Sequence, residues 1–239
     1  MKKTAVITGA NKGIGLEIGR QLGRAGFVVF LGARNPKLGE EAAAQLGSEG
    51  IEAHPVELDL DRPETIAAAV ATLRAHGGVD VLVNNAGIID AADGPPSSAN
   101  MQAVRRVLDV NFLGTLAVTQ AFLPLLREAP AARIVNLSSG LGSLTWNSDP
   151  AWDFAAVKLL GYNASKAAVN MLTVQLAYEL RDTGIKVNAA NPGFTATDMN
   201  GHRGTQSVEE GAAEPVRLAL LPADGPTGGF FDNSGPNPW

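Results

Sequence analysis

Short apolar runs and amphipathic segments alternate along the chain. The apolar runs are rich in Val, Ile and Leu without a regular polar alternation, which is typical of strands covered on both faces. They predict strands at 5–8, 28–31, 53–57, 79–84, 133–137, 186–191 and 229–231. The intervening segments have the spacing of helices that bury one face, at 14–25, 38–46, 63–75, 101–127, 155–181 and 207–218.

This order of elements predicts an α/β fold of the Rossmann type, a doubly wound, mostly parallel sheet of about seven strands with helices on both faces. No repeat or linker divides the chain, so residues 1–239 are expected to form a single domain. Three irregular stretches follow strand ends that should meet at one edge of the sheet, where open α/β folds bind ligands: 90–100, 140–153 and 198–206. We expect no role for the Pro- and Gly-rich tail, 233–239.

Composition narrows the classes of function. Hydrophobic residues make up 45% of the 239 residues and charged residues 18%, which excludes a disordered chain. The net charge of −5 argues against nucleic-acid binding. With no cysteine and three scattered histidines, no metal site is expected. No signal peptide is visible, and polar residues interrupt the longest apolar region, 110–126, so we expect a cytoplasmic protein without a membrane segment.

A glycine-rich loop follows the first predicted strand and opens the first predicted helix. Its sequence, TGANKGIG at 8–15, spaces three glycines as G-x3-G-x-G. Glycines here permit a tight turn and a close approach of the backbone to a pyrophosphate, and the helix N-terminus offers free N–H groups to the phosphates. The alternative is a turn without a ligand. The predicted cofactor contacts are Gly9, Asn11, Lys12, Gly13, Ile14 and Gly15.

Two cations indicate which dinucleotide would bind. The second predicted strand is followed by Ala33 and Arg34, where NAD sites usually carry an acid for the ribose 2′-hydroxyl. An arginine can instead hold a 2′-phosphate, and Lys12 adds a second positive charge. Both features favour NADP(H) over NAD(H), unless Arg34 and Lys12 are ordinary solvated charges.

A tyrosine and a lysine stand four positions apart on a predicted helix. Tyr162 and Lys166 would share one helix face. A neighbouring ammonium stabilises the phenolate and lowers the pKa of the tyrosine, which could then exchange a proton with a carbonyl or alcohol oxygen. Ser139 follows a predicted strand and could supply a hydroxyl to the same oxygen. An isolated aromatic–lysine pair at this spacing usually only packs and solvates.

The full set of motifs resembles the short-chain dehydrogenase/reductase family over nearly the whole chain. The matching pieces occur in the family's order: TGANKGIG at 8–15, DL at 59–60, NNAG at 84–87, Asn111, SS at 138–139, YNASK at 162–166 and PGFTATDM at 192–199. The resemblance implies a Rossmann fold, a nicotinamide cofactor and a reaction on C=O or CH–OH groups.

The resemblance also implies a role for individual residues. Tyr162 would be the general acid/base, and Lys166 would bind the nicotinamide ribose and lower the pKa of Tyr162. Ser139 would orient the substrate carbonyl, and Asn111 would complete a water-linked proton relay to Lys166. Asp59 and Leu60 would contact adenine, Asn85 the ribose side, and Thr195 the carboxamide. The remaining implied cofactor contacts are Ala86, Gly87, Pro192, Gly193 and Thr197.

One stretch departs from the common family pattern. Tyr162 lies 23 positions after Ser139, a longer interval than in many members, so the sequence predicts an inserted segment at about 140–155 near the substrate. This segment, with TDM at 197–199, is similar to the carbonyl-reductase-like branch. Trp146 and Trp152 either line an apolar pocket for a bulky ketone or aldehyde or anchor the inserted loop. The segment also leaves monomer and homodimer both open, because family members commonly pair through their two long helices.

The resulting expectation is an NADPH-dependent carbonyl reductase, reversible as a secondary-alcohol dehydrogenase, with a small-molecule carbonyl substrate. The alternatives are a 3-oxoacyl-thioester reductase on the same scaffold, or a non-catalytic NADP-binding sensor. The sensor is disfavoured by the retained Tyr162, Lys166, Ser139 and Asn111, because site residues carry function more reliably than the fold does.

Overall fold

A sheet of eight strands forms the centre of the computed structural model, which describes residues 2–239. The strands follow the order β3-β2-β1-β4-β5-β6-β7-β8, and all neighbours are parallel except β7 and β8. Their bounds are β1 Thr4–Ile7, β2 Val28–Ala33, β3 Ala53–Glu57, β4 Val81–Asn84, β5 Arg133–Leu137, β6 Lys186–Ala190, β7 Phe230–Asp232 and β8 Gly235–Pro236. The predicted doubly wound α/β fold is confirmed.

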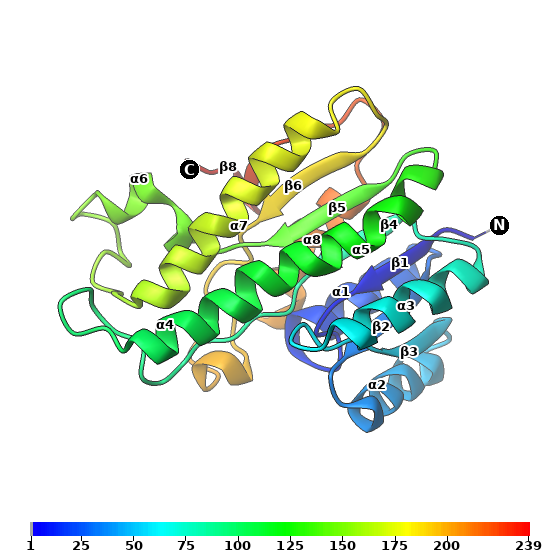
Figure 1. Cartoon of the computed structure of the whole chain (residues 1–239), viewed down its shortest axis with the longest axis horizontal. Coiled ribbons are helices and arrows are strands. Elements are labelled where there is room, and N and C mark those ends of the chain that lie inside the picture. The colour runs from blue at the N-terminus through cyan, green and yellow to red at the C-terminus, as the bar shows by residue number, and fades with distance from the viewer. Residues whose placement is uncertain (1) are drawn as a thin grey trace.

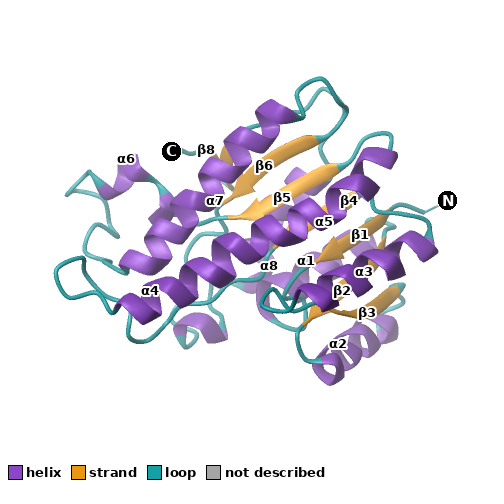
Figure 2. Cartoon of the chain, viewed as in Figure 1, coloured by secondary structure: helices purple, strands orange, loops and turns teal. Residues whose placement is uncertain are grey.

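Helices cover both faces of the sheet. Figure 1 shows α3, α5 and α7 in front of the sheet, with α1 and α8 behind it, and Figure 2 separates these helical layers from the strands. The helices are α1 Gly13–Arg24, α2 Pro36–Ser48, α3 Pro63–His76, α4 Met101–Leu108, α5 Thr115–Glu128, α6 Leu144–Asn147, α7 Leu160–Glu179 and α8 Val208–Ala219. A π-helical stretch, Asp109–Gly114, joins α4 to α5 without a break.

The core consists of two apolar layers, one on each side of the sheet. Along β1, Ala5 and Ile7 pack into the layer under α1, α2 and α8, whereas Val6 packs into the layer under α3, α5 and α7. All three side chains are fully buried. Because both faces of the strand are covered, its sequence shows no alternation of apolar and polar residues.

Two predictions about elements need correction. The sheet has an eighth strand, since Gly235–Pro236 pairs antiparallel with β7; a Pro- and Gly-rich pair gives no strand signal in the sequence. The helix predicted from residue 155 begins at Leu160, because residues 150–156 form turns. Turns there leave this helix shorter than predicted and place its N-terminus close to Tyr162.

The C-terminal tail, for which the sequence predicts no role, packs against the segment at 140–155. The ring of Trp239 stacks on Phe230 with a centroid distance of 5.5 Å, and its backbone carbonyl accepts a hydrogen bond from the Thr145 N–H at 2.9 Å. Figure 1 accordingly shows the C-terminus near α6. The tail therefore helps to hold this segment against the end of the sheet.

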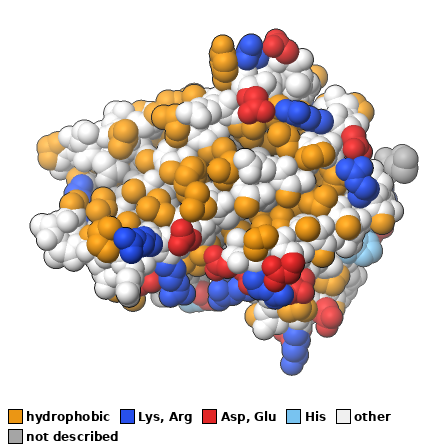
Figure 3. Space-filling model, viewed as in Figure 1, with side chains coloured by type: hydrophobic (Ala, Val, Ile, Leu, Met, Phe, Trp, Pro, Cys, Tyr) orange, Lys and Arg blue, Asp and Glu red, His pale blue; other side chains and the backbone are white. Residues whose placement is uncertain are grey.

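The front helices combine a buried and an exposed apolar face. Among the helices in residues 2–239, the continuous helix Met101–Glu128 is the one long and apolar enough by composition to cross a membrane. It instead buries Phe122 and Leu125 against the sheet, as a core helix does. Figure 3 shows hydrophobic side chains spread over this side of the molecule. The most exposed large ones on α4, α7 and the π-helical stretch are Met101, Leu113, Met171 and Tyr178.

Candidate active site

A cavity of about 690 Å³ lies beyond the carboxyl ends of β1, β4, β5 and β6. The strand order reverses direction between β1 and β4, which is the position where open α/β sheets bind ligands. Every cofactor contact expected from the sequence lines this cavity: Gly9, Asn11, Lys12, Gly13, Ile14, Gly15, Arg34, Asp59, Leu60, Asn85, Ala86, Gly87, Tyr162, Lys166, Pro192, Gly193, Thr195 and Thr197.

The glycine loop has the shape that a bound phosphate requires. Gly9 and Gly13 adopt φ angles of +62° and +56°, which favour glycine. A Cβ on Gly15 would overlap the Asn85 amide and the Gly9 carbonyl, so only glycine fits there. No side chain caps the start of α1 at Lys12, and the first N–H groups of the helix therefore remain available to phosphate oxygens.

The loop after β4 is bound directly to the glycine loop. The Asn85 side-chain amide donates to the carbonyls of Thr8 and Gly9 at 2.8 and 3.0 Å. The Thr8 hydroxyl oxygen accepts from the backbone N–H groups of Asn85 and Ala86 at 3.0 and 2.9 Å. These bonds fix one wall of the cavity against the other. Asn85 therefore acts on the glycine loop itself, a contact that the sequence does not indicate.

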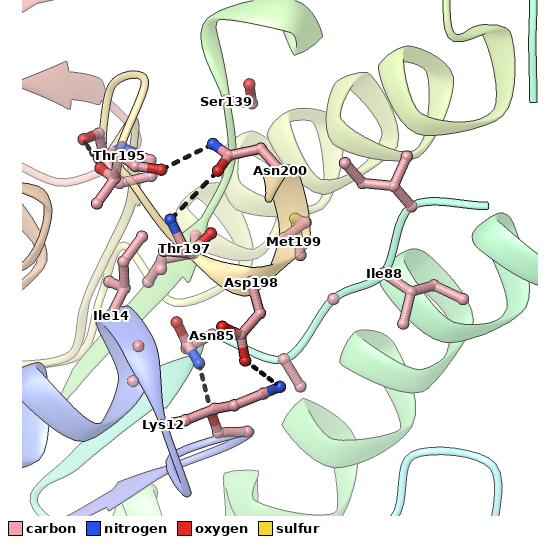
Figure 4. Close-up of a pocket in the computed structure, with 18 of the residues that line it drawn as sticks. Lys12, Ile14, Asn85, Ile88, Ser139, Thr195, Thr197, Asp198, Met199 and Asn200 are labelled. Atoms are coloured by element: carbon pink, nitrogen blue, oxygen red, sulfur yellow. Dashed lines mark hydrogen bonds and ion pairs between the residues drawn. The ribbon is translucent and has the colours of Figure 1, made fainter. Parts of the chain in front are cut away.

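The loop after β6 forms the opposite wall. The Asn200 amide bridges this loop, because its nitrogen donates to the Thr195 carbonyl at 2.8 Å and its oxygen accepts from the Thr197 N–H at 3.2 Å. An ion pair joins this loop to the glycine loop on the other side of the cavity. Lys12 Nζ lies 2.6 Å from Asp198 Oδ2 (Figure 4). Lys12, expected to hold a 2′-phosphate, is therefore paired with a carboxylate.

Arg34 is in a different position. It lines the cavity, and within residues 2–239 it forms no ion pair or side-chain hydrogen bond. Nearby Arg20 also reaches the cavity, but its guanidinium is bound by the carboxylates of Glu17 and Glu49. Arg34 is thus the arginine of this pair whose charge is available to an anion.

Tyr162, Lys166 and Ser139 meet at the end of β5. Tyr162 and Ser139 both line the cavity, and the Ser139 hydroxyl lies close enough to the phenol to influence its pKa. Lys166 is 5% exposed, and its ammonium lies 5.7 Å from the centre of the Tyr162 ring. It donates to the Leu137 carbonyl at 2.8 Å. The side chains expected to exchange a proton with a substrate are therefore assembled in one place.

The acidities of these groups reflect burial. Burial raises the pKa of the Tyr162 phenol, and the nearby Ser139 hydroxyl only partly offsets the rise. Burial also lowers the pKa of Lys166 to about 8. The ammonium of Lys166 was expected to lower the pKa of Tyr162, but in the protein alone loss of hydration has the larger effect.

Asn111 lies behind the cavity wall. It is fully buried, and its side-chain oxygen accepts from the Ile88 N–H at 2.7 Å. Its side-chain nitrogen donates to the Ile88 carbonyl and to the Ser165 hydroxyl, both at 3.0 Å. The residue sits in the π-helical stretch between α4 and α5, and such distortions often occur at functional sites. The proton-relay role of Asn111 stays a prediction.

Trp146 and Trp152 lie outside the set of residues that line the cavity. Their rings stack on each other with centroids 5.5 Å apart, and Trp146 also packs near Phe230. This arrangement supports the reading in which they anchor the segment at 140–155, whereas their contact with substrate stays a prediction. Phe194, which the sequence analysis did not single out, lines the cavity and touches Phe154 edge-on at 5.8 Å.

Other apolar residues of the cavity were also missed. They come from four different loops and helix starts, and no local spacing relates them to one another: Ile88, Ile89, Leu141, Leu159 and Met199. Phe194 and Met199 could have been found, because both lie inside the PGFTATDM motif. The others are brought together only by the fold.

Comparison of the sequence with protein families identifies the family to which this chain belongs. A family model described as short chain dehydrogenase matches residues 3–207. The chain belongs to the short-chain dehydrogenase family. Members of this family act on C=O and CH–OH groups as oxidoreductases, and this short-chain dehydrogenase shares that class of activity.

Three relatives show where this short-chain dehydrogenase stands within the family. It is 36% identical to carbonyl reductase [NADPH] 1 of Rattus norvegicus, over 100% of this chain and 99% of the relative. Its structure is similar to the NADPH-bound carbonyl reductase from chicken fatty liver, with a TM-score of 0.86, 29% identity, and 100% and 94% of the two chains covered. Salutaridine reductase from Papaver somniferum gives a TM-score of 0.83, 30% identity, and 97% and 100% covered.

The rat carbonyl reductase is longer than this short-chain dehydrogenase. The alignment with the rat enzyme extends over 279 positions, although this chain has 239 residues. The rat carbonyl reductase therefore contains segments that are absent here.

Proposed function

We propose that the protein is an NADPH-dependent carbonyl reductase that reduces a ketone or aldehyde and, in reverse, oxidises a secondary alcohol. The observation that carries the proposal is the position of Tyr162 beside the buried Lys166, with Ser139 lining the same cavity as the glycine loop. The proton donor Tyr162 and the glycine loop that would bind the cofactor therefore line the same cavity.

The residues of the chain divide the work of the reaction. The nicotinamide, when bound, supplies the hydride that goes to the carbonyl carbon. The Tyr162 hydroxyl donates its proton to the carbonyl oxygen, and the Ser139 hydroxyl donates a hydrogen bond to the same oxygen, which stabilises the negative charge that develops there. The Lys166 ammonium would hold the nicotinamide ribose, and its positive charge favours the phenolate left on Tyr162. Asn111 fixes the loop that carries Ile88.

NADP(H) is the cofactor that fits these residues better. Arg34 offers an unpaired guanidinium at the cavity wall, and a guanidinium binds phosphate oxygens in a bidentate manner. The [NADPH] in the name of the rat relative and the NADPH bound to the chicken enzyme support the same choice. The N–H groups at the start of α1 would hold the pyrophosphate.

An apolar ketone or aldehyde suits the substrate end of the cavity. Its walls include Leu141, Leu159, Phe194 and Met199. A 3-oxoacyl thioester on an acidic carrier would instead favour a basic rim. Two cations of the cavity, Lys12 and Arg106, are paired with carboxylates, so they offer little net positive charge to such a carrier.

Turnover by the wild type and by Tyr162→Phe tests the proposal. The purified protein is mixed with NADPH or NADH and a panel of ketones, aldehydes and a 3-oxoacyl thioester, and loss of the reduced nicotinamide absorbance is followed. We expect reduction of apolar ketones with NADPH and a loss of about 10²- to 10⁴-fold in kcat for Tyr162→Phe. NADPH fluorescence should show that this variant still binds the cofactor. Full activity in Tyr162→Phe, or NADPH binding without turnover across the panel, would overturn the proposal, and the second outcome would indicate a sensor.

A further inference from the structure

The start of α7, the helix that carries Tyr162 and Lys166, is capped from a distant part of the chain. Asp93 Oδ1 accepts a hydrogen bond from the Gly161 N–H at 3.0 Å, and Asp93 Oδ2 accepts one from the Tyr162 N–H at 2.9 Å. The Leu160 N–H donates to the Gly94 carbonyl at 3.0 Å. The first three N–H groups of the catalytic helix are therefore all satisfied by two residues of the loop after β4.

No nearer residue performs this task. Leu159, which precedes the helix, has no side chain able to accept a hydrogen bond. The approach of Asp93 also depends on glycine at 161, because a Cβ there would lie 3.1 Å from Asp93 Oδ2 and 3.0 Å from the Val104 backbone. The helix start, the loop and α4 are thus packed as tightly as a glycine allows.

The same loop is fixed to α7 at a second point. Asn111 holds both backbone groups of Ile88 and also donates to the Ser165 hydroxyl on α7. The loop begins with Ala86 and Gly87 at the cofactor cavity and reaches the start of α7 with Asp93 and Gly94. One rigid connection therefore joins the cavity wall to the peptide N–H of Tyr162.

We infer that Asp93 is a positioning residue for Tyr162, holding the start of the catalytic helix so that the phenol hydroxyl meets the substrate oxygen, and that its charge adds to the effect of burial on the acidity of that hydroxyl. The inference rests on the proposed function, in which Tyr162 donates the proton. Nothing in the motifs of the family resemblance indicates Asp93.

The negative charge of Asp93 opposes the partial positive charge at the start of α7. A helix N-terminus carries a partial positive charge, which favours a phenolate on Tyr162 in the first turn. The Asp93 carboxylate at that end offsets this charge and favours the protonated phenol. Of the other charged groups on the packed elements, Lys166 binds the Leu137 carbonyl and Arg106 of α4 pairs with Asp90 at 3.5 Å, whereas Arg105 of α4 and Asp109 of the π-helical stretch are exposed to water. Lys158, just before the helix, is exposed to water.

Three substitutions of Asp93 separate the effect of its hydrogen bonds to the helix start from the effect of its charge. Asp93→Asn keeps one acceptor oxygen and removes the charge, Asp93→Glu keeps the charge on a longer side chain, and Asp93→Ala removes both. Asp153→Asn is the matched control, because it removes an exposed carboxylate from the turns just before α7 that does not line the cavity. We expect kcat for ketone reduction to fall about 10- to 100-fold in Asp93→Ala, with the KM for ketone and the Kd for NADPH changed less than about twofold.

The pH profile gives the readout that a purely structural cap would not move. In Asp93→Asn, the pH at which alcohol oxidation reaches half its maximal kcat should fall by about half a pH unit, as expected for one charge acting over roughly 10 Å in a partly solvated site. Asp93→Glu should keep the wild-type profile at a reduced kcat. Asp153→Asn should match the wild type in both respects.

A titration that needs no turnover keeps the inference separate from the proposed function. The chain has two tyrosines, so in a Tyr178→Phe background the phenolate absorbance reports Tyr162 alone. The pKa of Tyr162 should be lower with Asn than with Asp at position 93. An unchanged pKa together with a wild-type kcat in Asp93→Ala would overturn the inference, as would a loss of thermal stability alone. Activity retained in Tyr162→Phe would instead overturn the proposed function.

Discussion

Lys12 and Asp198 form an ion pair across the mouth of the cofactor cavity, with 2.6 Å between Nζ and Oδ2. Lys12 belongs to the glycine loop and Asp198 to the loop after β6, so the pair joins the two walls that a dinucleotide would separate. Asp198 also lies 2.8 Å from the His202 ring nitrogen. The hydrogen bond and charge of Lys12, followed by those of His202, lower the pKa of the Asp198 carboxyl. The carboxylate is therefore ionised at neutral pH and competes for the Lys12 charge.

Replacing Asp198 with asparagine should strengthen NADPH binding. The substitution frees the Lys12 ammonium for the 2′-phosphate and removes a negative charge that repels it. Because both side chains are more than half exposed, the effect should be modest, a decrease in the NADPH Kd of about two- to fivefold. The NADH Kd should change less. Titration of NADPH and NADH fluorescence at low and high salt measures both constants, and equal tightening of the two cofactors would contradict the explanation.

Arg34 should determine the preference for NADPH. Arg34→Ala removes a guanidinium that lines the cavity, and the loss of a charge-assisted contact to phosphate should raise the NADPH Kd by about 10- to 100-fold. NADH, which has no 2′-phosphate, should bind with a Kd within about twofold of the wild type. Arg24→Ala is the matched control, because Arg24 pairs with Glu49 and does not line the cavity. A parallel loss of NADH affinity in Arg34→Ala would show a structural role instead.

The buried Lys166 should make stability rise with pH. Its pKa is lowered from 10.5 to about 8, so between these values the unfolded chain holds a proton that the folded chain has released. The free energy of unfolding of the wild type should therefore increase relative to Lys166→Met, by about 2 kcal/mol between pH 7 and pH 9.5. Denaturant unfolding of both proteins at the two pH values measures the difference. A difference that stays constant would mean that Lys166 keeps its ordinary pKa.

Trp146 should support the fold of the segment at 140–155, whereas Phe194 should contact the substrate. Trp146→Ala removes a ring stacked on Trp152 and should lower the Tm by about 4–8 °C, while the ratio of kcat/KM for a ring ketone to that for a small ketone stays constant. Phe194→Ala removes a ring that lines the cavity and should lower the same ratio by about two- to tenfold. A change of this ratio in Trp146→Ala would show that the tryptophan reaches the substrate.

The sequence by itself determined the features that depend on neighbouring residues. Apolar runs and amphipathic segments predicted the strands, the helices and their α/β order. These signals are local, because the spacing of apolar residues along the chain follows the repeat of the strand or helix that they form. The glycine loop was recognisable because three glycines follow a strand and open a helix. Tyr162 and Lys166 share the cavity because four positions on a helix place two side chains on one face.

Only the tertiary structure decided which distant residues meet. Lys12 is separated from Asp198 by 186 positions, and Asp93 from Tyr162 by 69, so no local pattern relates either pair. Trp146 and Trp152 were candidates for the substrate wall, yet packing against Phe230 and each other places them outside the cavity. The acidity of Tyr162 also depended on burial, which spacing does not reveal. Long-range contacts and desolvation arise from how whole segments pack, and short-range spacing contains no information about either.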